Sequence, residues 1–305
     1  MKTNNVTLNR SIIGAACAGA VMLAASSASA QNLFVGNYTT GTIIEYAPNG
    51  TPTPVTSGMA YPVGMAFNSA GDLFIGNSDN NFGGGTQGNI TEITPGGTVS
   101  TFASGIDPQG IAFNGAGNLF EADYRSGNIY EFAPNGSRTT YASGFSFPLS
   151  LAFNAAGDLF VGSGYGNGNG VINEFTPGGT ESTFATGLSF PQGMTFNSAG
   201  DLFVANNGLG TIVEITPGGT QSTFATLPNS ALPDGLAFNS AGNLFVADNS
   251  GRIDEYAPNG SETTFATDPA GGVLGGLAFA PVPEPSTFAL AGLGGIALLF
   301  RRRKS

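Results

Sequence analysis

This 305-residue chain repeats two short sequence phrases, and side chains with oxygen atoms occur at a fixed position beside or within each of them. The phrase Leu-Phe-Val-Ala-Asp, or a close variant, begins six times and ends on a polar residue each time. Those last residues are Asn37, Asn77, Asp123, Ser163, Asn206 and Asp248. A second phrase, Gly-Leu-Ala-Phe-Asn or similar, is preceded in three copies by a polar residue: Gln109, Gln192 and Asp234. Carboxylate and amide oxygens are the ligands that hard cations such as Ca²⁺ prefer.

The two phrases are expected to form adjacent antiparallel strands, so the start of one and the end of the other lie at the same rim. The sequence therefore predicts a channel mouth, with Ca²⁺ as its candidate cofactor, formed by Asn37, Asn77, Gln109, Asp123, Gln192, Asn206, Asp234 and Asp248. An alternative interpretation stays open, in which these polar residues cap strands and hold water. Repetition favours the alternative, because six equivalent glutamates, from Glu45 to Glu255, are more typical of a scaffold than of six active sites.

Composition excludes several reaction classes. The chain has no histidine, and its one cysteine, Cys17, lies near the N-terminus. Imidazole general-base catalysis and Ser-His-Asp or Cys-His nucleophilic catalysis are therefore excluded. A zinc site lacks its usual ligands.

Charge is strongly negative between residues 31 and 281. Three basic residues, Arg125, Arg138 and Arg252, face nineteen acidic ones there, which leaves a net charge near −16. Nucleic acid and anionic lipid are poor partners for such a surface, whereas cations and neutral polymers suit it.

The phrases recur with a period in the forties, which is typical of propellers and helical solenoids. The Ala-Phe-Asn phenylalanines are Phe67, Phe113, Phe153, Phe196 and Phe238. Long helices are disfavoured, because 48 residues are glycine and Pro-Gly-Gly or Pro-Asn-Gly turns recur. Each unit is expected to form four short strands, as in the copy with strands near 64–68, 73–77, 89–93 and 99–103.

The two ends of the repeat are complementary. The first Leu-Phe-Val-Ala-Asp phrase, at Leu33, has no Ala-Phe phrase before it. The last Ala-Phe phrase, at Phe279, has no Leu-Phe-Val-Ala-Asp phrase after it. The sequence thus predicts an all-β, six-bladed β-propeller over residues 31–281. Its last blade combines an inner strand near 276–279 with three strands from the N-terminal segment, which closes the ring.

The repeat resembles NHL-type six-bladed propellers in its Pro-x-Gly-Leu-Ala-Phe-Asn and Ala-Gly-Asp-Leu-Phe-Val-Ala-Asp phrases. That resemblance implies the fold, but it does not select a function. Pro233-Asp234-Gly235 is also similar to a segment of gluconolactonase-like propellers, in which the Asp binds a divalent metal. The metal-binding Glu and Asn of that family have no counterparts here, where the equivalent positions are Val63, Gln109, Leu149, Gln192 and Gly275.

The two ends of the chain are expected to be targeting segments. Residues 1–30 have a basic start, an apolar stretch and an Ala-Ser-Ala exit, which predicts a signal peptide read by the Sec export machinery. Residues 282–305 begin with Pro283-Glu284-Pro285, continue with a short apolar run and end with Arg301, Arg302, Arg303 and Lys304. This tail resembles the PEP-CTERM sorting signal. The resemblance implies an exosortase as partner, transient anchoring by a marginal transmembrane segment, and display or release at the cell surface.

Three functions are expected from these features. The first is a non-enzymatic surface or matrix protein whose propeller binds an extracellular polysaccharide or protein. The second is a divalent-metal-dependent, lactonase-like hydrolase or lyase that acts in the channel through Asp234. The third is a sugar-polymer binder that uses exposed Tyr38, Tyr124 and Tyr165 near the mouth, and the absence of tryptophan disfavours it.

Overall fold

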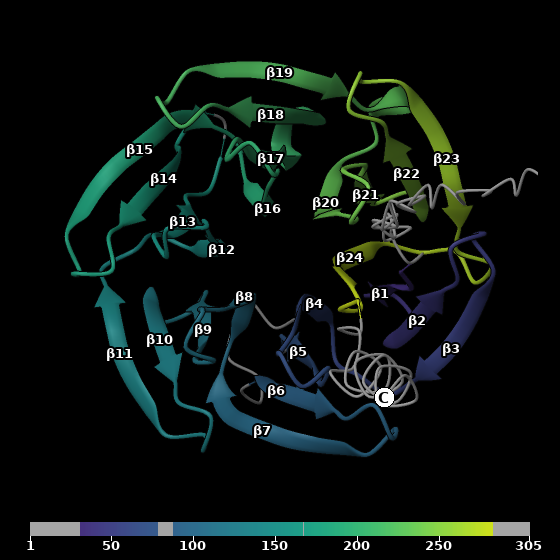
Figure 1. Cartoon of the computed structure of the whole chain (residues 1–305), viewed down its shortest axis with the longest axis horizontal. Coiled ribbons are helices and arrows are strands. Elements are labelled where there is room, and N and C mark those ends of the chain that lie inside the picture. Colours follow the sequence, from purple (N-terminus) through teal and green to yellow (C-terminus); the bar gives the residue numbers. More distant parts are fainter. Residues whose placement is uncertain (1–30, 79–87, 167, 283–305) are drawn as a thin grey trace, which may run out of the picture.

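Six four-stranded antiparallel sheets surround a central channel in the computed structural model, which describes residues 31–78, 88–166 and 168–282 (Figure 1). The predicted signal peptide and the tail from Pro283 onward lie outside these residues. The predicted six-bladed propeller with four strands per blade is confirmed.

Each blade runs from an inner strand at the channel to an outer strand at the periphery. Blade one contains β4 (Pro62–Phe67), β5 (Leu73–Asn77), β6 (Gly88–Ile93) and β7 (Val99–Ile106). Blade two contains β8 (Pro108–Phe113), β9 (Leu119–Asp123), β10 (Asn128–Phe132) and β11 (Arg138–Ser143). Blade three contains β12 (Pro148–Phe153), β13 (Leu159–Ser163), β14 (Gly170–Phe175) and β15 (Glu181–Leu188).

Blades four and five add two short 3-10 helices at their loops. Blade four contains β16 (Pro191–Phe196), β17 (Leu202–Asn206), β18 (Thr211–Ile215) and β19 (Gln221–Thr226), with η1 at Asn207–Leu209. Blade five contains β20 (Pro233–Phe238), β21 (Leu244–Asp248), β22 (Arg252–Tyr256) and β23 (Glu262–Thr267), preceded by η2 at Pro228–Ser230.

Blade six joins the two ends of the described chain, as the complementary phrases predict. Its strands are β24 (Leu274–Phe279), β1 (Leu33–Asn37), β2 (Thr42–Tyr46) and β3 (Pro52–Thr56), in that order from the channel outward. Leu33 pairs with Phe279, and Val35 pairs with Leu277. The backbone of the chain's beginning and end therefore completes one sheet, which removes the open edge.

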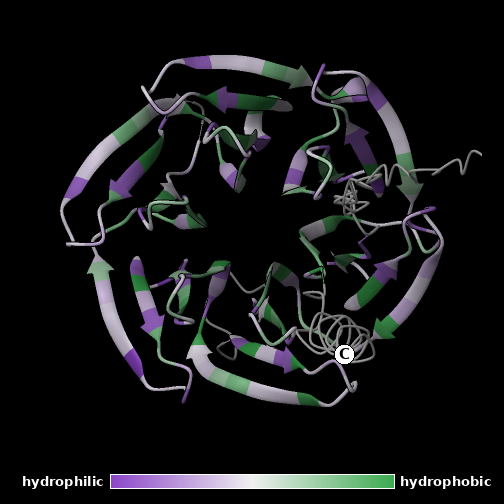
Figure 2. Cartoon of the chain, in the orientation of Figure 1, coloured by the Kyte–Doolittle hydropathy of each residue, from purple (hydrophilic) through white to green (hydrophobic). Residues whose placement is uncertain are grey.

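The core lies between blades, since the second strand of every blade is buried along its whole length or nearly so. Aromatic side chains from three strands meet edge to face at the interfaces, as Phe203 does with Phe224 and Phe238 at 5.0 and 5.1 Å. Such edge-to-face pairs stabilise beyond their buried area. The outermost strands are polar or neutral over much of their length, in keeping with their exposure (Figure 2).

The inner strands differ from the prediction at their starts. Five of them begin at a proline, two residues earlier than expected, at Pro62, Pro108, Pro148, Pro191 and Pro233. Proline has no backbone N–H, so it is tolerated at the first residue of a strand, where no ladder bond is lost.

Inner strands of neighbouring blades approach so closely that a side chain would not fit between them. A Cβ on Gly193 would collide with the carbonyl oxygen of Asp234, and one on Gly235 would collide with that of Gly275. The glycine of the Pro-x-Gly phrase therefore sets the small diameter of the channel.

Candidate functional site

The channel wall consists of layers built from equivalent residues of the six inner strands. It encloses a cavity of about 100 Å³. The uppermost layer contains Gln109, Gln192 and Asp234 together with Val63 and Leu149. The next layer is glycine in five blades and Ser150 in blade three, and the third is apolar: Met65, Ile111, Leu151, Met194, Leu236 and Leu277. The carboxylate and amide side chains of the channel wall are thus confined to one layer.

A β-bulge aims the polar residues into the channel. In blade five, Pro233 pairs with Asp248 and Leu236 pairs with Val246, so the register shifts between them at Asp234 and Gly235. The same shift occurs at Gln109 and at Gln192. Bulges commonly redirect a side chain in this way.

Asp234 is the one carboxylate in this layer. The hydroxyl of Tyr38, which follows β1, donates a hydrogen bond of 3.3 Å to Asp234 Oδ1. Burial raises the pKa of the Asp234 carboxyl to about 7, although the Tyr38 hydrogen bond acts in the opposite direction. Burial, and then the Asp234 charge, raise the pKa of the Tyr38 phenol well above its usual value. Tyr38 occupies the space beside Gly275, where no side chain could stand.

The eight predicted site residues do not come together. Gln109, Gln192 and Asp234 line the channel. The other five are buried at strand ends: Asn37, Asn77, Asp123, Asn206 and Asp248. Four of them accept hydrogen bonds from nearby loops, whereas Asn77 donates to Asn89 and Thr91 of β6.

Two of these strand-end residues show what the group does. Asp123 accepts the backbone N–H of Asp107 at 2.8 Å and that of Ser126 at 2.7 Å. Asn206 accepts the backbone N–H of Ser189 at 2.6 Å. Side-chain oxygens occupied by loop N–H groups hold the connections between strands in place. They lie at the same rim as the channel mouth, but they end the second strand of each blade and do not line the channel, whose wall is formed by the inner strands.

The channel residues fit a divalent cation poorly. Ca²⁺ takes six to eight oxygen ligands, several of them carboxylates in strong sites. Here one carboxylate, already hydrogen-bonded by Tyr38, stands with two amides. The described residues contain no group of three or more Asp, Glu, His or Cys side chains able to hold a metal ion.

A row of aromatic side chains follows part of the rim, and we call it the aromatic arc: Tyr124, Phe147, Tyr165 and Phe190. Neighbouring ring centroids lie 5.0, 5.6 and 4.2 Å apart along it. Phe147 is 41% exposed and Tyr165 is 55% exposed. The predicted mouth residues Tyr124 and Tyr165 thus belong to one surface, whereas half-buried Tyr38 stands apart and stacks on Tyr61 at 6.1 Å.

Sequence reasoning missed Phe147 and Phe190. Both have positive φ, 53° in each case, which is rare for a bulky residue. Both also precede a proline that begins an inner strand, and residues in that position favour extended backbone. The Phe-Pro dipeptide before the Gly phrase is the signal that could have identified them.

A buried acid, Glu121, was also missed. It is 0% exposed in the second strand of blade two, where other blades have Val35, Ile75, Val161, Val204 and Val246. Both of its carboxyl oxygens are buried and have no hydrogen-bond partner among the described residues. Burial, followed by the nearby Asp123 and Asp107, raises its pKa well above the usual value. The break in the repeated valine pattern was visible in the sequence.

Comparisons with known proteins support the fold and the tail. The PEP-CTERM protein-sorting motif family matches residues 281–304. The chain therefore carries a signal for export and for recognition by an exosortase. No curated protein matches the chain. No helix among residues 31–78, 88–166 and 168–282 is long and apolar enough to span a membrane; the predicted tail span lies outside them.

Solved propellers resemble the ring in fold. A putative gluconolactonase matches with 16% identity and a TM-score of 0.62, over 73% of this chain and 82% of its own. Virginiamycin B lyase from Staphylococcus aureus matches with 15% identity and a TM-score of 0.58, over 78% and 81% of the two chains. Another structure of that lyase, described as catalytically inactive because an alanine replaces a histidine, matches with 14% identity and a TM-score of 0.59, over 84% and 94%. At these identities the likeness establishes the fold alone: the chain is a six-bladed β-propeller with a C-terminal PEP-CTERM sorting motif.

Proposed function

We propose that the chain is an exported, surface-sorted protein whose propeller binds a neutral extracellular polysaccharide without catalysing a reaction. The aromatic arc is the observation that carries this proposal. Four rings from three successive blades touch one another beside the channel mouth, and two of them are widely exposed. Aromatic side chains have large apolar faces, and tyrosine also has a hydroxyl, so they are suited to stacking on sugar rings.

The backbone of the repeat orients two rings of the arc. Phe147 and Phe190 are two of the five non-glycine residues with positive φ among those described, and Tyr61 has the same conformation at the equivalent place before Pro62. The carbonyl oxygens of all three accept a backbone N–H from the loop that follows the second strand of the blade. This conformation is therefore a feature of the blade, and it presents the rings of Phe147 and Phe190 to the arc.

Charge selects the kind of polymer. The ring is near −16, and Arg125 is the nearest basic residue in sequence to the arc. An anionic polysaccharide would be repelled, whereas a neutral one would not. The sorting motif supplies the setting, since it directs the protein out of the cytoplasm.

Binding of neutral polymers tests the proposal directly. Affinity electrophoresis of the purified protein through gels containing dextran, laminarin or galactomannan, with alginate as the anionic comparison, should show retardation by at least one neutral polymer. Tyr165→Ala should weaken that retention about fivefold, because one stacking contact is lost. Leu209→Ala is the matched control, since Leu209 is 56% exposed on the next blade and lies outside the arc. Equal behaviour of the two variants, or no retention by any neutral polymer, would contradict the proposal.

A second candidate is a lactonase-like hydrolase in the channel. Asp234, with its pKa near 7, is the observation that favours it, because a group that titrates near neutrality can act as a general acid or base. The histidine on which the similar lyase depends has no counterpart, since this chain contains none. A hydrolase would also need more metal ligands than the channel offers, so binding is the better-supported function.

A further inference from the structure

A groove between blades four and five is larger than the channel cavity and lies away from the channel and the aromatic arc. Its volume is about 540 Å³, which is within the range of small-molecule sites. Phe203, Phe224, Phe238 and Tyr256 contribute aromatic walls, and Glu214 contributes a carboxylate. We propose that this groove binds a small organic cation of the substituted-ammonium type, with the aromatic rings around its apolar part and Glu214 paired with its charge.

The carboxylate of Glu214 lacks the amide partner that three of the equivalent glutamates, Glu45, Glu131 and Glu255, have. In blade two, Asn118 donates to Glu131 at 2.6 Å, and in blade five Asn243 donates to Glu255 at the same distance. In blade four the residue at the asparagine position is Asp201, which cannot donate an amide N–H to Glu214. Its carboxylate instead accepts a hydrogen bond of 2.9 Å from the side-chain amide of Asn197. Glu214 therefore faces the groove with its charge available.

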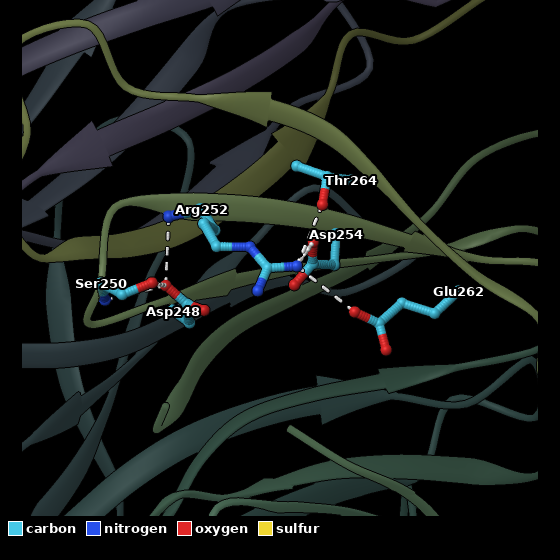
Figure 3. A network of polar contacts seen from close by, with 6 residues as sticks. All are labelled: Asp248, Ser250, Arg252, Asp254, Glu262 and Thr264. Carbon is cyan, nitrogen blue, oxygen red and sulfur yellow. Dashed lines mark hydrogen bonds and ion pairs between the residues drawn. The ribbon is translucent and has the colours of Figure 1, made fainter. Parts of the chain in front are cut away.

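Tyr256 contributes a ring, not a polar group, to the same groove. The residue is 2% exposed and its hydroxyl is buried away from the groove surface. Burial, and then the Glu262 carboxylate, raise the pKa of this phenol. Glu262 also pairs with Arg252 at 3.3 Å, in a network that contains Asp254 and Thr264 (Figure 3).

The other blade interfaces serve as internal comparisons. The position of Tyr256 is occupied by Phe132 between blades one and two, by Ile215 between blades three and four, and by Tyr46 between blades five and six. The last of these has the phenol, but there Glu255 already accepts an amide. Among these interfaces, the one between blades four and five combines an amide-free glutamate with a tyrosine.

Charge and ring chemistry indicate the ligand class. A cation near aromatic faces is attracted by their electron-rich surfaces, and quaternary ammonium groups are recognised by such rings together with a carboxylate. The net charge of the ring also favours a cation over an anion.

Choline and its neutral isostere 3,3-dimethylbutan-1-ol are the probes that test this inference. Titration calorimetry on the purified protein should show binding of choline and at least about tenfold weaker binding of the neutral alcohol. Glu214→Gln should weaken choline binding about tenfold. Tyr256→Phe keeps the ring and should bind choline as the original protein does, and it should fold because Phe132 and Phe175 occupy equivalent places.

Glu174→Gln is the matched control. Glu174 is the equivalent glutamate of blade three, where Asn154 also donates to an aspartate, Asp158, and Ile215 replaces the tyrosine. This variant should bind choline as the original protein does. The inference is overturned if choline does not bind, if the neutral alcohol binds equally well, or if Glu174→Gln and Glu214→Gln have the same effect. None of these outcomes depends on polysaccharide binding at the arc.

Discussion

The side chain of Gln31 donates a hydrogen bond of 2.8 Å to the carbonyl oxygen of Ala280, although the two residues are 249 positions apart. The backbone N–H of Ala280 in turn donates to the carbonyl oxygen of Asn32 at 3.0 Å. The backbone bond continues the β1–β24 ladder past its last residue pair, Leu33 with Phe279, and the Gln31 side chain adds a bond beyond it. Strand pairing and this side-chain bond therefore hold the seam of the ring.

Deletion of β24 should open the ring. Residues 274–279 contribute Leu274 and Leu277 to the core between blades five and six, and their loss exposes β1 as an edge. We expect the melting temperature to fall by at least about 10 °C. Truncation after Val282, which leaves β24 intact, is the control and should melt as the full chain does. Equal melting of both truncated proteins would contradict closure by this strand.

Glu121→Val should stabilise the protein at neutral pH. The folded-state pKa of Glu121 is raised, so above about pH 4.3 the folded chain binds the proton more strongly than the unfolded chain. The free energy of unfolding therefore falls as pH rises from that point toward the folded-state pKa. Valine restores the residue type of the other blades and should raise the free energy of unfolding by roughly 1–3 kcal/mol at pH 8.

Urea denaturation at pH 5 and pH 8 measures this effect. The gain from Glu121→Val should be larger at pH 8 than at pH 5. Val161→Ile, at the equivalent position of blade three, is the control and should show no such pH dependence. A gain that is the same at both pH values would mean that Glu121 is not protonated in the folded chain.

Tyr38→Phe should raise the pKa of Asp234 above its value of about 7. The Tyr38 hydroxyl bonds to the ionised carboxylate and lowers that pKa, so its removal leaves the effect of burial unopposed. Carbon-13 NMR titration of the Asp234 carboxyl measures its pKa in the original protein and in Tyr38→Phe. The carboxyl signal is assigned because it is missing from the spectrum of Asp234→Asn. A pKa near 4 in the original protein would show that Asp234 is well hydrated.

Because the pKa of Asp234 is raised on folding, this residue should also make the protein less stable as pH rises from about 4 to about 7. Asp234→Asn should therefore reduce the loss of melting temperature over that range. The comparison uses the same buffers as the titration. If the melting temperature of Asp234→Asn depends on pH as that of the original protein does, Asp234 does not contribute to the pH dependence of stability and the prediction is wrong.

Millimolar Ca²⁺ should leave the melting temperature unchanged, because the channel offers one carboxylate and two amides. Mg²⁺ at the same ionic strength is the control for screening. A rise with Ca²⁺ that Asp234→Ala abolishes would instead favour the metal-dependent hydrolase, and a panel of lactone substrates would then be the next measurement.

Sequence periodicity determined the fold of this chain to a large extent. The repeated apolar strand phrase, the turn glycines and the complementary fragments at Leu33 and Phe279 together predicted six blades and their closure. They succeed because a strand that is buried on both faces and a tight turn each restrict residue type locally. The absence of histidine and the Pro283-Glu284-Pro285 tail are likewise read directly from the sequence.

Tertiary structure decided which side chains face the channel. The sequence predicted both Asp123 and Asp234 to lie at the channel mouth. In the structure Asp123 accepts backbone N–H groups of loops, whereas Asp234 lines the cavity. The difference arises because Asp234 stands in the bulge of an inner strand, β20, whereas Asp123 ends the second strand of its blade, β9. Tyr165 of blade three and Phe190, which precedes β16 of blade four, meet only because neighbouring blades place their loops together. Side-chain direction depends on register and on packing between blades, which local residue patterns do not encode.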